Sequence, residues 1–151
     1  MVNKNIVLVI LAVLLGQYSW SQEKLVAKAN DKYEEYSFSP AIDIYKKVLE
    51  KGYSSFDLLK NLGNSYYFNA DYKEAAQTYK RLLAEFKPQV GPEYYFRYAQ
   101  TLKSLGDYES ADAMMSQFSK MTADDVRAKN FSDEEDYLEE IKKNSGRYDI
   151  T

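Results

Sequence analysis

The side chains that could do chemistry in this chain of 151 residues are carboxylates, amides, hydroxyls and cations, because the sequence contains neither histidine nor cysteine. This composition excludes nucleophiles that a histidine activates, and it removes the usual ligands of zinc and copper. Two adjacent carboxylate pairs, Glu34 with Glu35 and Glu139 with Glu140, would point to different faces of a helix, which does not suit paired acid–base catalysis. We therefore expect no enzyme: no catalytic residues, no metal site and no cofactor.

A second set of polar residues has the chemistry of peptide binding. Its members recur three or four positions apart within two segments, a spacing that places side chains on one face of a helix. Amides can hydrogen-bond to a peptide backbone and cations can pair with carboxylates, so the set suits an extended acidic or polar peptide. The candidate binding residues are Asn30, Lys60, Asn61, Asn64, Tyr67, Arg97, Gln100 and Lys103. The alternative is that they only solvate an exposed face.

The elements that must position these residues follow from a repeat. Three alanines, Ala41, Ala75 and Ala111, are 34 and 36 residues apart, and an aromatic residue or methionine follows each of them four positions later. A small alanine lets two helices approach closely, and the large side chain one turn later fills the gap to the neighbouring helix. Periods of this length are typical of helical repeats.

Capping and turn residues divide the repeats into helix pairs. The predicted helices cover residues 23–35, 39–51, 55–68, 72–86, 93–105 and 108–120. Gly52 is expected to end the second helix, and Ser54 with Asp57 is expected to cap the third. Beyond residue 120, Thr122 would cap a short helix, and an acidic helix with a narrow apolar stripe would follow at 133–144.

The middle repeat carries a recognisable set of residues: Leu62, Gly63, Tyr66, Tyr72, Ala75, Tyr79 and Pro88. This set resembles the tetratricopeptide repeat, and the resemblance extends over about residues 24–120. It implies an all-α fold, a short right-handed α-solenoid of about three helix–turn–helix units plus a C-terminal capping helix. The units would cover residues 23–52, 55–88 and 93–120, within a repeat region of 22–121, and the cap would cover 122–146.

The resemblance also implies where a ligand binds. In this family the first helix of each pair lines a concave face, and the eight candidate residues would lie there. Some members hold a C-terminal carboxylate in a clamp, and Asn30, Asn61 and Arg97 match that clamp. Val26 and Glu93 stand where the clamp has lysines. We therefore do not expect binding of chaperone tails.

The N-terminus has the pattern of a secretory signal peptide. Lys4 is followed by an apolar run over residues 6–15, which as a helix would span about 15 Å, roughly half of a bilayer core. Ser19 and Ser21 are small residues at the positions that signal peptidase reads before a cut at Gln22. We expect residues 1–21 to be removed; the alternative is that they stay as a membrane anchor.

The whole layout is similar to the N-terminal module of large OmpA-family envelope proteins of Bacteroidota, some of them associated with type IX secretion and gliding. Its elements are the leader, the tyrosine-rich repeats, the acidic helix and an extended exit at 147–151. The resemblance implies a periplasmic, outer-membrane-associated scaffold whose partners are other envelope proteins or peptides. Peptidoglycan would be bound only through a further C-terminal domain.

Charge and composition leave few other partners. The net charge of −3 and the lack of a basic stripe argue against nucleic acid. After cleavage of the leader, no direct insertion into a membrane is expected. The alternative functions are a stand-alone secreted or signal-anchored adaptor in envelope assembly and a passive structural spacer.

Overall fold

The computed structural model describes residues 21–131 together with residues 140 and 143. The described residues are helical or lie in short connections, and no strand occurs among them. The predicted signal peptide, the exit at 147–151 and most of the acidic helix at 133–144 lie outside the described residues. The chain divides into two compact units, Met1–Gln89 and Val90–Thr151, called here the N-terminal unit and the C-terminal unit.

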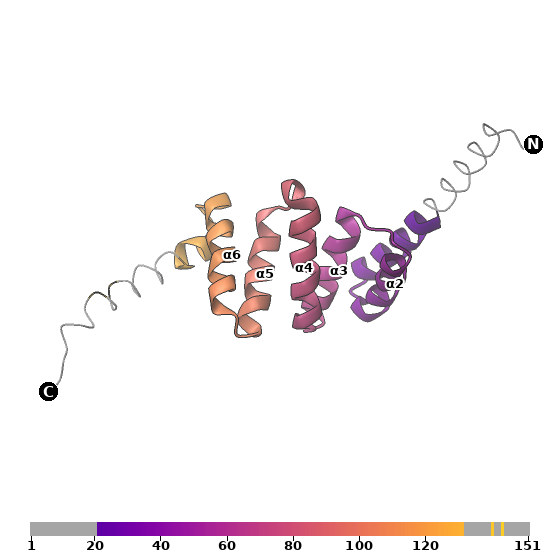
Figure 1. The fold of residues 1–151 in the computed structure, drawn as a ribbon, viewed down its shortest axis with the longest axis horizontal. Helices are drawn as coiled ribbons and strands as arrows, with labels where there is room; N and C mark the ends of the chain where they lie inside the picture. Colours follow the sequence, from indigo (N-terminus) through magenta and orange to yellow (C-terminus); the bar gives the residue numbers. More distant parts are fainter. Residues whose placement is uncertain (1–20, 132–139, 141–142, 144–151) are drawn as a thin grey trace, which may run out of the picture. The chain divides into compact units, whose positions relative to one another are not determined.

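The N-terminal unit consists of two helix pairs (Figure 1). The first helix is described over residues 21–34. It is followed by α2 (Phe38–Glu50), α3 (Phe56–Phe68), α4 (Tyr72–Phe86) and a single 3-10 turn, η1 (Lys87–Gln89). Helix α3 packs against both α2 and α4, which places it at the centre of the unit.

The C-terminal unit consists of one helix pair and the start of a further helix. Its elements are α5 (Pro92–Ser104), α6 (Tyr108–Met121) and a helical segment described over residues 126–131. Helix α5 packs along α6. Pro92 is the first residue of α5, where its fixed φ and missing N–H cost nothing. The helices that the repeat spacing predicts are therefore confirmed to within about one residue at most ends.

The alanine–aromatic pairs of the repeat form the core. Ala41, Tyr45 and Ala75 are fully buried, and Tyr79 is 1% exposed. A methyl group added to Gly63 would lie 2.8 Å from Cε1 of Tyr79, so only glycine allows this ring to lie against α3. Tyr66, another residue of the repeat motif, is only half-buried.

Three equivalent turns connect the helices of each pair with a left-handed residue. These residues are Tyr36, Ala70 and Gly106, with φ of 57°, 59° and 79°, and they are spaced 34 and 36 residues apart like the alanines of the core. Glycine adopts this conformation without strain, whereas a residue with a Cβ does not. Only the third turn thus has the residue that suits its backbone best.

Two predicted caps are wrong by a few residues. Helix α3 is capped by Ser55, whose hydroxyl accepts from the N–H of Leu58, and not by Ser54. Thr122 ends α6 instead of starting the next helix, because its hydroxyl donates to a carbonyl one turn back. Asp125 accepts from the N–H of Arg127 and begins the following helical segment.

Candidate functional site

Two of the candidate binding residues lie in the packed interior of the N-terminal unit. Asn61 is 9% exposed and Asn64 is 2% exposed. The expectation that both side chains face a ligand on the concave surface therefore does not fit their burial. Their spacing along α3 is that of one helix face, but this face is covered by the neighbouring helices, which a sequence period alone cannot reveal.

Asn30 and Asn61 meet through a shared hydrogen-bond acceptor. The amide Nδ2 of Asn61 donates to Oδ1 of Asn30 over 3.0 Å, and the hydroxyl of Tyr45 donates to the same oxygen over 2.6 Å. Burial raises the pKa of Tyr45 well above its usual value. The network therefore joins the first helix, α2 and α3 through polar groups that are already partnered.

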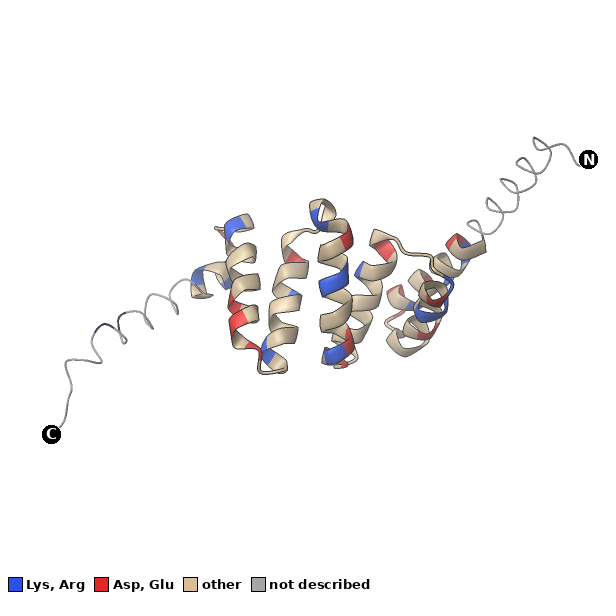
Figure 2. Cartoon of the chain, in the orientation of Figure 1, with Lys and Arg blue, Asp and Glu red and all other residues tan. Residues whose placement is uncertain are grey.

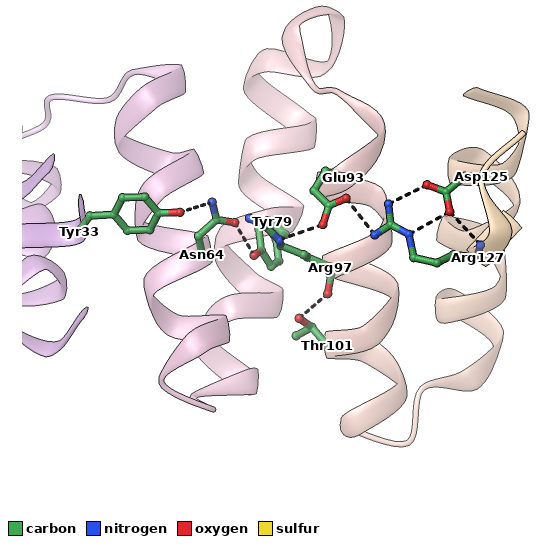
Figure 3. Close-up of polar contacts among 8 residues, drawn as sticks. All are labelled: Tyr33, Asn64, Tyr79, Glu93, Arg97, Thr101, Asp125 and Arg127. Atoms are coloured by element: carbon green, nitrogen blue, oxygen red, sulfur yellow. Dashed lines mark hydrogen bonds and ion pairs between the residues drawn. The ribbon is translucent and has the colours of Figure 1, made fainter. Parts of the chain in front are cut away.

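Asn64 forms a second network of the same kind (Figure 3). Its amide Nδ2 donates to the hydroxyl of Tyr33 over 3.1 Å, and its Oδ1 accepts from the hydroxyl of Tyr79 over 2.9 Å. The asparagine-to-tyrosine bond spans 15 residues, as does the bond between Tyr45 and Asn30. An equivalent hydrogen bond between asparagine and tyrosine therefore connects the two helices of each pair in the N-terminal unit.

Two candidate residues of α3 remain partly accessible. The Lys60 ammonium donates to Asp57 over 2.7 Å and lies 5.5 Å from the centre of the Phe56 ring. Tyr67 contacts the ring of Phe68. These side chains can still reach a ligand, whereas the buried asparagines can act only by holding the helices in place.

The candidate residue Arg97 belongs to a line of alternating charges in the C-terminal unit (Figure 3). Its Nε lies 3.4 Å from Oε1 of Glu93, and the other oxygen of Glu93 accepts from Arg127 over 3.0 Å. Arg127 also donates to Oδ2 of Asp125 over 2.9 Å, and this hydrogen bond lowers the pKa of Asp125 below its usual range. The acid at position 93, where the clamp has a lysine, therefore partly neutralises the cation that would meet a ligand carboxylate.

Arg127 also packs against aromatic rings. Its guanidinium carbon lies 4.3 Å from the centre of the Phe96 ring and 4.9 Å from that of Phe118. A guanidinium can stack on an aromatic face while its N–H groups stay paired with carboxylates. This side chain therefore fixes the segment after α6 on the helix pair.

The other two candidate residues of the C-terminal unit, Gln100 and Lys103, line an open groove of about 520 Å³. The groove lies over α5, α6 and the helical segment at 126–131. Its remaining lining residues are Phe96, Ala99, Tyr108, Ala111, Asp112, Met115, Arg127, Asn130 and Phe131. Aromatic and methionine side chains thus form apolar surface beside amide and cationic groups.

The sequence prediction missed the residues that the third helical segment contributes to this groove, namely Arg127, Asn130 and Phe131. Their spacing of three and four is the signal that could have identified them. The sequence pattern predicts only a capping role for this segment, and a cap needs no ligand-facing side. Tertiary packing places these three residues along one side of the groove.

The charges on the described helices are mixed in sign. Figure 2 shows acidic and basic residues interspersed on the helices, with no continuous basic stripe on the face in view. Among the described residues, no helix is long and apolar enough to cross a bilayer, and no group of acidic side chains is arranged to hold a metal ion.

A comparison with protein families identifies one repeat in the sequence of the C-terminal unit. The family model of the tetratricopeptide repeat matches residues 92–125, which comprise α5, α6 and the turn that follows. The residue pattern favoured the middle repeat instead. No curated protein sequence is significantly similar to the chain.

Solved structures with the same fold have low sequence identity. The C-terminal tetratricopeptide-repeat domain of an FK506-binding protein of Plasmodium falciparum has a TM-score of 0.64 and 16% identity, over 82% of this chain and 92% of that chain. Another is PcrH of Pseudomonas aeruginosa, solved with the chaperone binding region of PopB (TM-score 0.58, 18% identity, 76% and 90% coverage). The first repeat domain of Spaghetti (RPAP3), bound to an HSP90 peptide, has a TM-score of 0.61 and 18% identity, over 72% of this chain and 85% of that chain.

The predicted fold class is confirmed by these structures, although the capping helix lies mostly outside the described residues. The chain carries a tetratricopeptide repeat at residues 92–125, and the fold of its described residues is that of tetratricopeptide-repeat proteins.

Proposed function

We propose that this protein is a non-catalytic scaffold that binds an extended acidic or polar segment of a partner protein in the groove of its C-terminal unit. The observation that carries the proposal is the groove itself, about 520 Å³ in volume and open to solvent along α5 and α6. Two residues chosen from sequence for their chemistry, Gln100 and Lys103, line it.

The lining suits a peptide better than a small metabolite. Gln100 and Asn130 offer amides that can hydrogen-bond to a peptide backbone, and Lys103 offers a cation for a carboxylate. Phe96 and Met115 offer apolar surface for side chains of the peptide. Methionine adapts its shape to different partners, so the groove is suited to a segment whose sequence varies.

The ligand is proposed to be an internal segment of a partner and not a chain terminus. A terminal carboxylate needs unpaired cations, and Glu93 stands beside Arg97 and Arg127. In the N-terminal unit, Lys60 and Tyr67 are the candidate residues that a partner could still contact. The buried Asn61 and Asn64 would hold the helices that present them.

Two similar structures support a peptide or protein partner. PcrH is solved with the chaperone binding region of PopB, and the repeat domain of Spaghetti (RPAP3) with the HSP90 peptide SRMEEVD. The second of these ligands is acidic, as we propose here.

We propose further that the protein acts in the bacterial periplasm, in association with the outer membrane. The leader pattern of residues 1–21 and the resemblance of the layout to envelope proteins of the OmpA family support this location. The partners would then be other envelope proteins, within a secretion or assembly complex.

Binding of labelled peptides tests the groove. A fluorescein-labelled peptide of twelve residues, rich in Glu, Ser and Leu, is compared with its counterpart in which Lys replaces Glu, by fluorescence anisotropy. The acidic peptide should bind more tightly, and Lys103→Glu should weaken it about tenfold, the effect of losing roughly 1.4 kcal/mol.

Lys120→Glu is the matched control, because Lys120 is exposed on α6 and does not line the groove. Equal affinity of both peptides, or an equal effect of both substitutions, would argue for general electrostatic attraction. If neither peptide binds and an envelope extract yields no specific partner, the protein is better described as a passive spacer.

A further inference from the structure

A cluster of aromatic side chains lies at the turn end of the N-terminal unit, outside the proposed peptide groove. We call it the aromatic edge; its members are Tyr33, Tyr36, Phe38, Tyr67, Phe68 and Tyr72. The rings of Phe38 and Phe68 stack with centres 5.2 Å apart, and Tyr36 meets Phe38 edge-on at 6.2 Å. The edge therefore joins the two turns that follow the first helix and α3.

Tyr36 is unfavourable for stability in two respects. Its side chain is 82% exposed, and its φ of 57° lies in the left-handed region, which strains a bulky residue. The equivalent turn positions hold Ala70 and Gly106. Strained residues that persist in a structure cluster at functional sites, so this tyrosine points to a ligand of the edge.

The edge surrounds a shallow groove of about 320 Å³. Its lining consists of Tyr33, Glu34, Tyr36, Phe38 and Phe68. Phe68 is 47% exposed, so flat ring surface is accessible from outside. The one charged side chain in the lining is a carboxylate, and Glu34 makes no ion pair with any residue in the described part of the chain.

We propose that the aromatic edge binds a proline-rich segment of a partner protein that carries a basic residue. A polyproline II helix is already extended and loses little conformational entropy when it docks on an aromatic-lined groove. The hydroxyl of Tyr36 can donate to its solvent-exposed carbonyls, since such a helix has no internal hydrogen bonds. A lysine or arginine of the segment would pair with Glu34.

The segment is proposed to carry a basic residue because the charged residue in the groove lining, Glu34, is acidic. Of the acidic residues near the groove, Glu35 is paired with Lys32 over 2.6 Å, whereas Glu34 faces the groove. An acidic segment would place its carboxylates against Glu34 and be repelled. The two proposed sites thus prefer opposite charges, and each can fail without the other.

The test uses a fluorescein-labelled peptide, Ala-Pro-Pro-Leu-Pro-Pro-Arg-Pro, and fluorescence anisotropy with the full chain. Tyr36→Gly is the decisive variant, because it removes the ring and also relieves the backbone strain. We expect it to weaken binding about tenfold or more while the thermal midpoint stays equal or rises. Glu34→Gln should weaken binding less and reduce its dependence on salt.

Met121→Ala is the control for the loss of an exposed apolar side chain, because Met121 is 50% exposed in the C-terminal unit and lines neither proposed groove; it should leave binding unchanged. A peptide with alanine in place of every proline should not bind. Equal binding of the alanine peptide, or undiminished binding by Tyr36→Gly, would overturn the proposal. Binding of a chitin oligosaccharide that depends on Tyr36, without binding of the proline peptide, would also overturn it and indicate a glycan surface.

Discussion

Asparagine side chains link different helices through hydrogen bonds in the interior of the N-terminal unit. A buried amide is costly unless its oxygen and nitrogen both find partners. Asn64 is 2% exposed and has both, one on the first helix and one on α4. Asn30 accepts two hydrogen bonds with one oxygen. Each of these residues connects three helices through hydrogen bonds of defined geometry, which apolar contacts alone do not provide.

Removing the Asn64 amide should destabilise the protein. Asn64→Ala removes the amide oxygen that accepts from the buried hydroxyl of Tyr79, and we expect a loss of about 1–3 kcal/mol in the free energy of unfolding. Tyr79→Phe removes the other partner, and the double variant should lose less than the sum of both changes. Urea denaturation followed by circular dichroism measures all three.

Asn69→Ala is the matched control, because Asn69 is an asparagine at the C-terminal end of α3, the helix that carries Asn64. Asn69 is exposed and its side-chain Nδ2 donates to Oδ2 of Asp71 over 2.7 Å, so the loss of its side chain should change the free energy of unfolding by less than about 0.5 kcal/mol. Additive effects of Asn64→Ala and Tyr79→Phe would show that the bond between them contributes nothing to stability.

Tyr45 should make the fold sensitive to alkaline pH. Burial raises its pKa in the folded state, whereas in the unfolded chain the group ionises near its ordinary pKa of about 10. The stabilisation from the neutral hydroxyl is therefore complete below about pH 10 and is lost as the pH rises above that value. Thermal midpoints from pH 8 to 11 should fall at the alkaline end.

The matching variant is Tyr45→Phe, which cannot ionise. It should be less stable near neutral pH because Asn30 loses a donor, but its midpoint should fall less steeply above pH 10. A decline as steep as that of the unaltered protein would assign the alkaline sensitivity to other tyrosines.

At the scale of elements, the spacing of helices depends on a few small residues. Gly63 lets the ring of Tyr79 lie against the backbone of α3, and the added Cβ of an alanine would come within 2.8 Å of that ring. Tyr79 is 1% exposed and is held by its hydrogen bond. The ring therefore cannot move aside without disturbing the pair.

Gly63→Ala should consequently destabilise the N-terminal unit. Overpacking costs about 1–3 kcal/mol, which exceeds the gain of at most about 1 kcal/mol from helix propensity. Gly91→Ala is the control, since nothing lies within 4 Å of its added Cβ. Chemical denaturation of both variants checks the expectation, and a stabilised Gly63→Ala would mean that α3 and α4 can separate at little cost.

At the scale of the whole molecule, the chain forms two compact units, and the two binding surfaces that we propose prefer ligands of opposite charge. The proposed acidic-peptide groove belongs to the C-terminal unit, and the aromatic edge belongs to the N-terminal unit. Such a division would let one protein hold two different segments, as expected of a scaffold in an assembly.

Export should be visible in the mass of the isolated protein. If the leader is removed as the sequence pattern predicts, the intact mass corresponds to a chain that starts at Gln22, and Trp20, the only tryptophan, is absent. Tryptophan fluorescence excited at 295 nm would then be lost. A retained leader would give the full mass and would favour an anchored adaptor.

The sequence by itself determined the helices, their pairing and the class of fold. Local signals suffice for these features: the period of 34 to 36 residues, the alanine–aromatic pairs, and residues such as Gly52 and Gly106 that end helices. Each acts within a few positions along the chain, so a reader of the sequence can recognise it. The errors at this level were shifts of one residue or a few, as at Ser55 and Asp125.

Only the tertiary structure decided which polar residues a partner can reach. The spacing of three or four positions on α3 applies equally to Lys60, Asn61 and Asn64, yet the neighbouring helices cover only the two asparagines. Likewise, Arg127 completes the groove because packing brings it beside Glu93, 34 positions earlier. Burial and long-range pairing depend on what other elements contribute at the same place, and no local pattern in the chain encodes that.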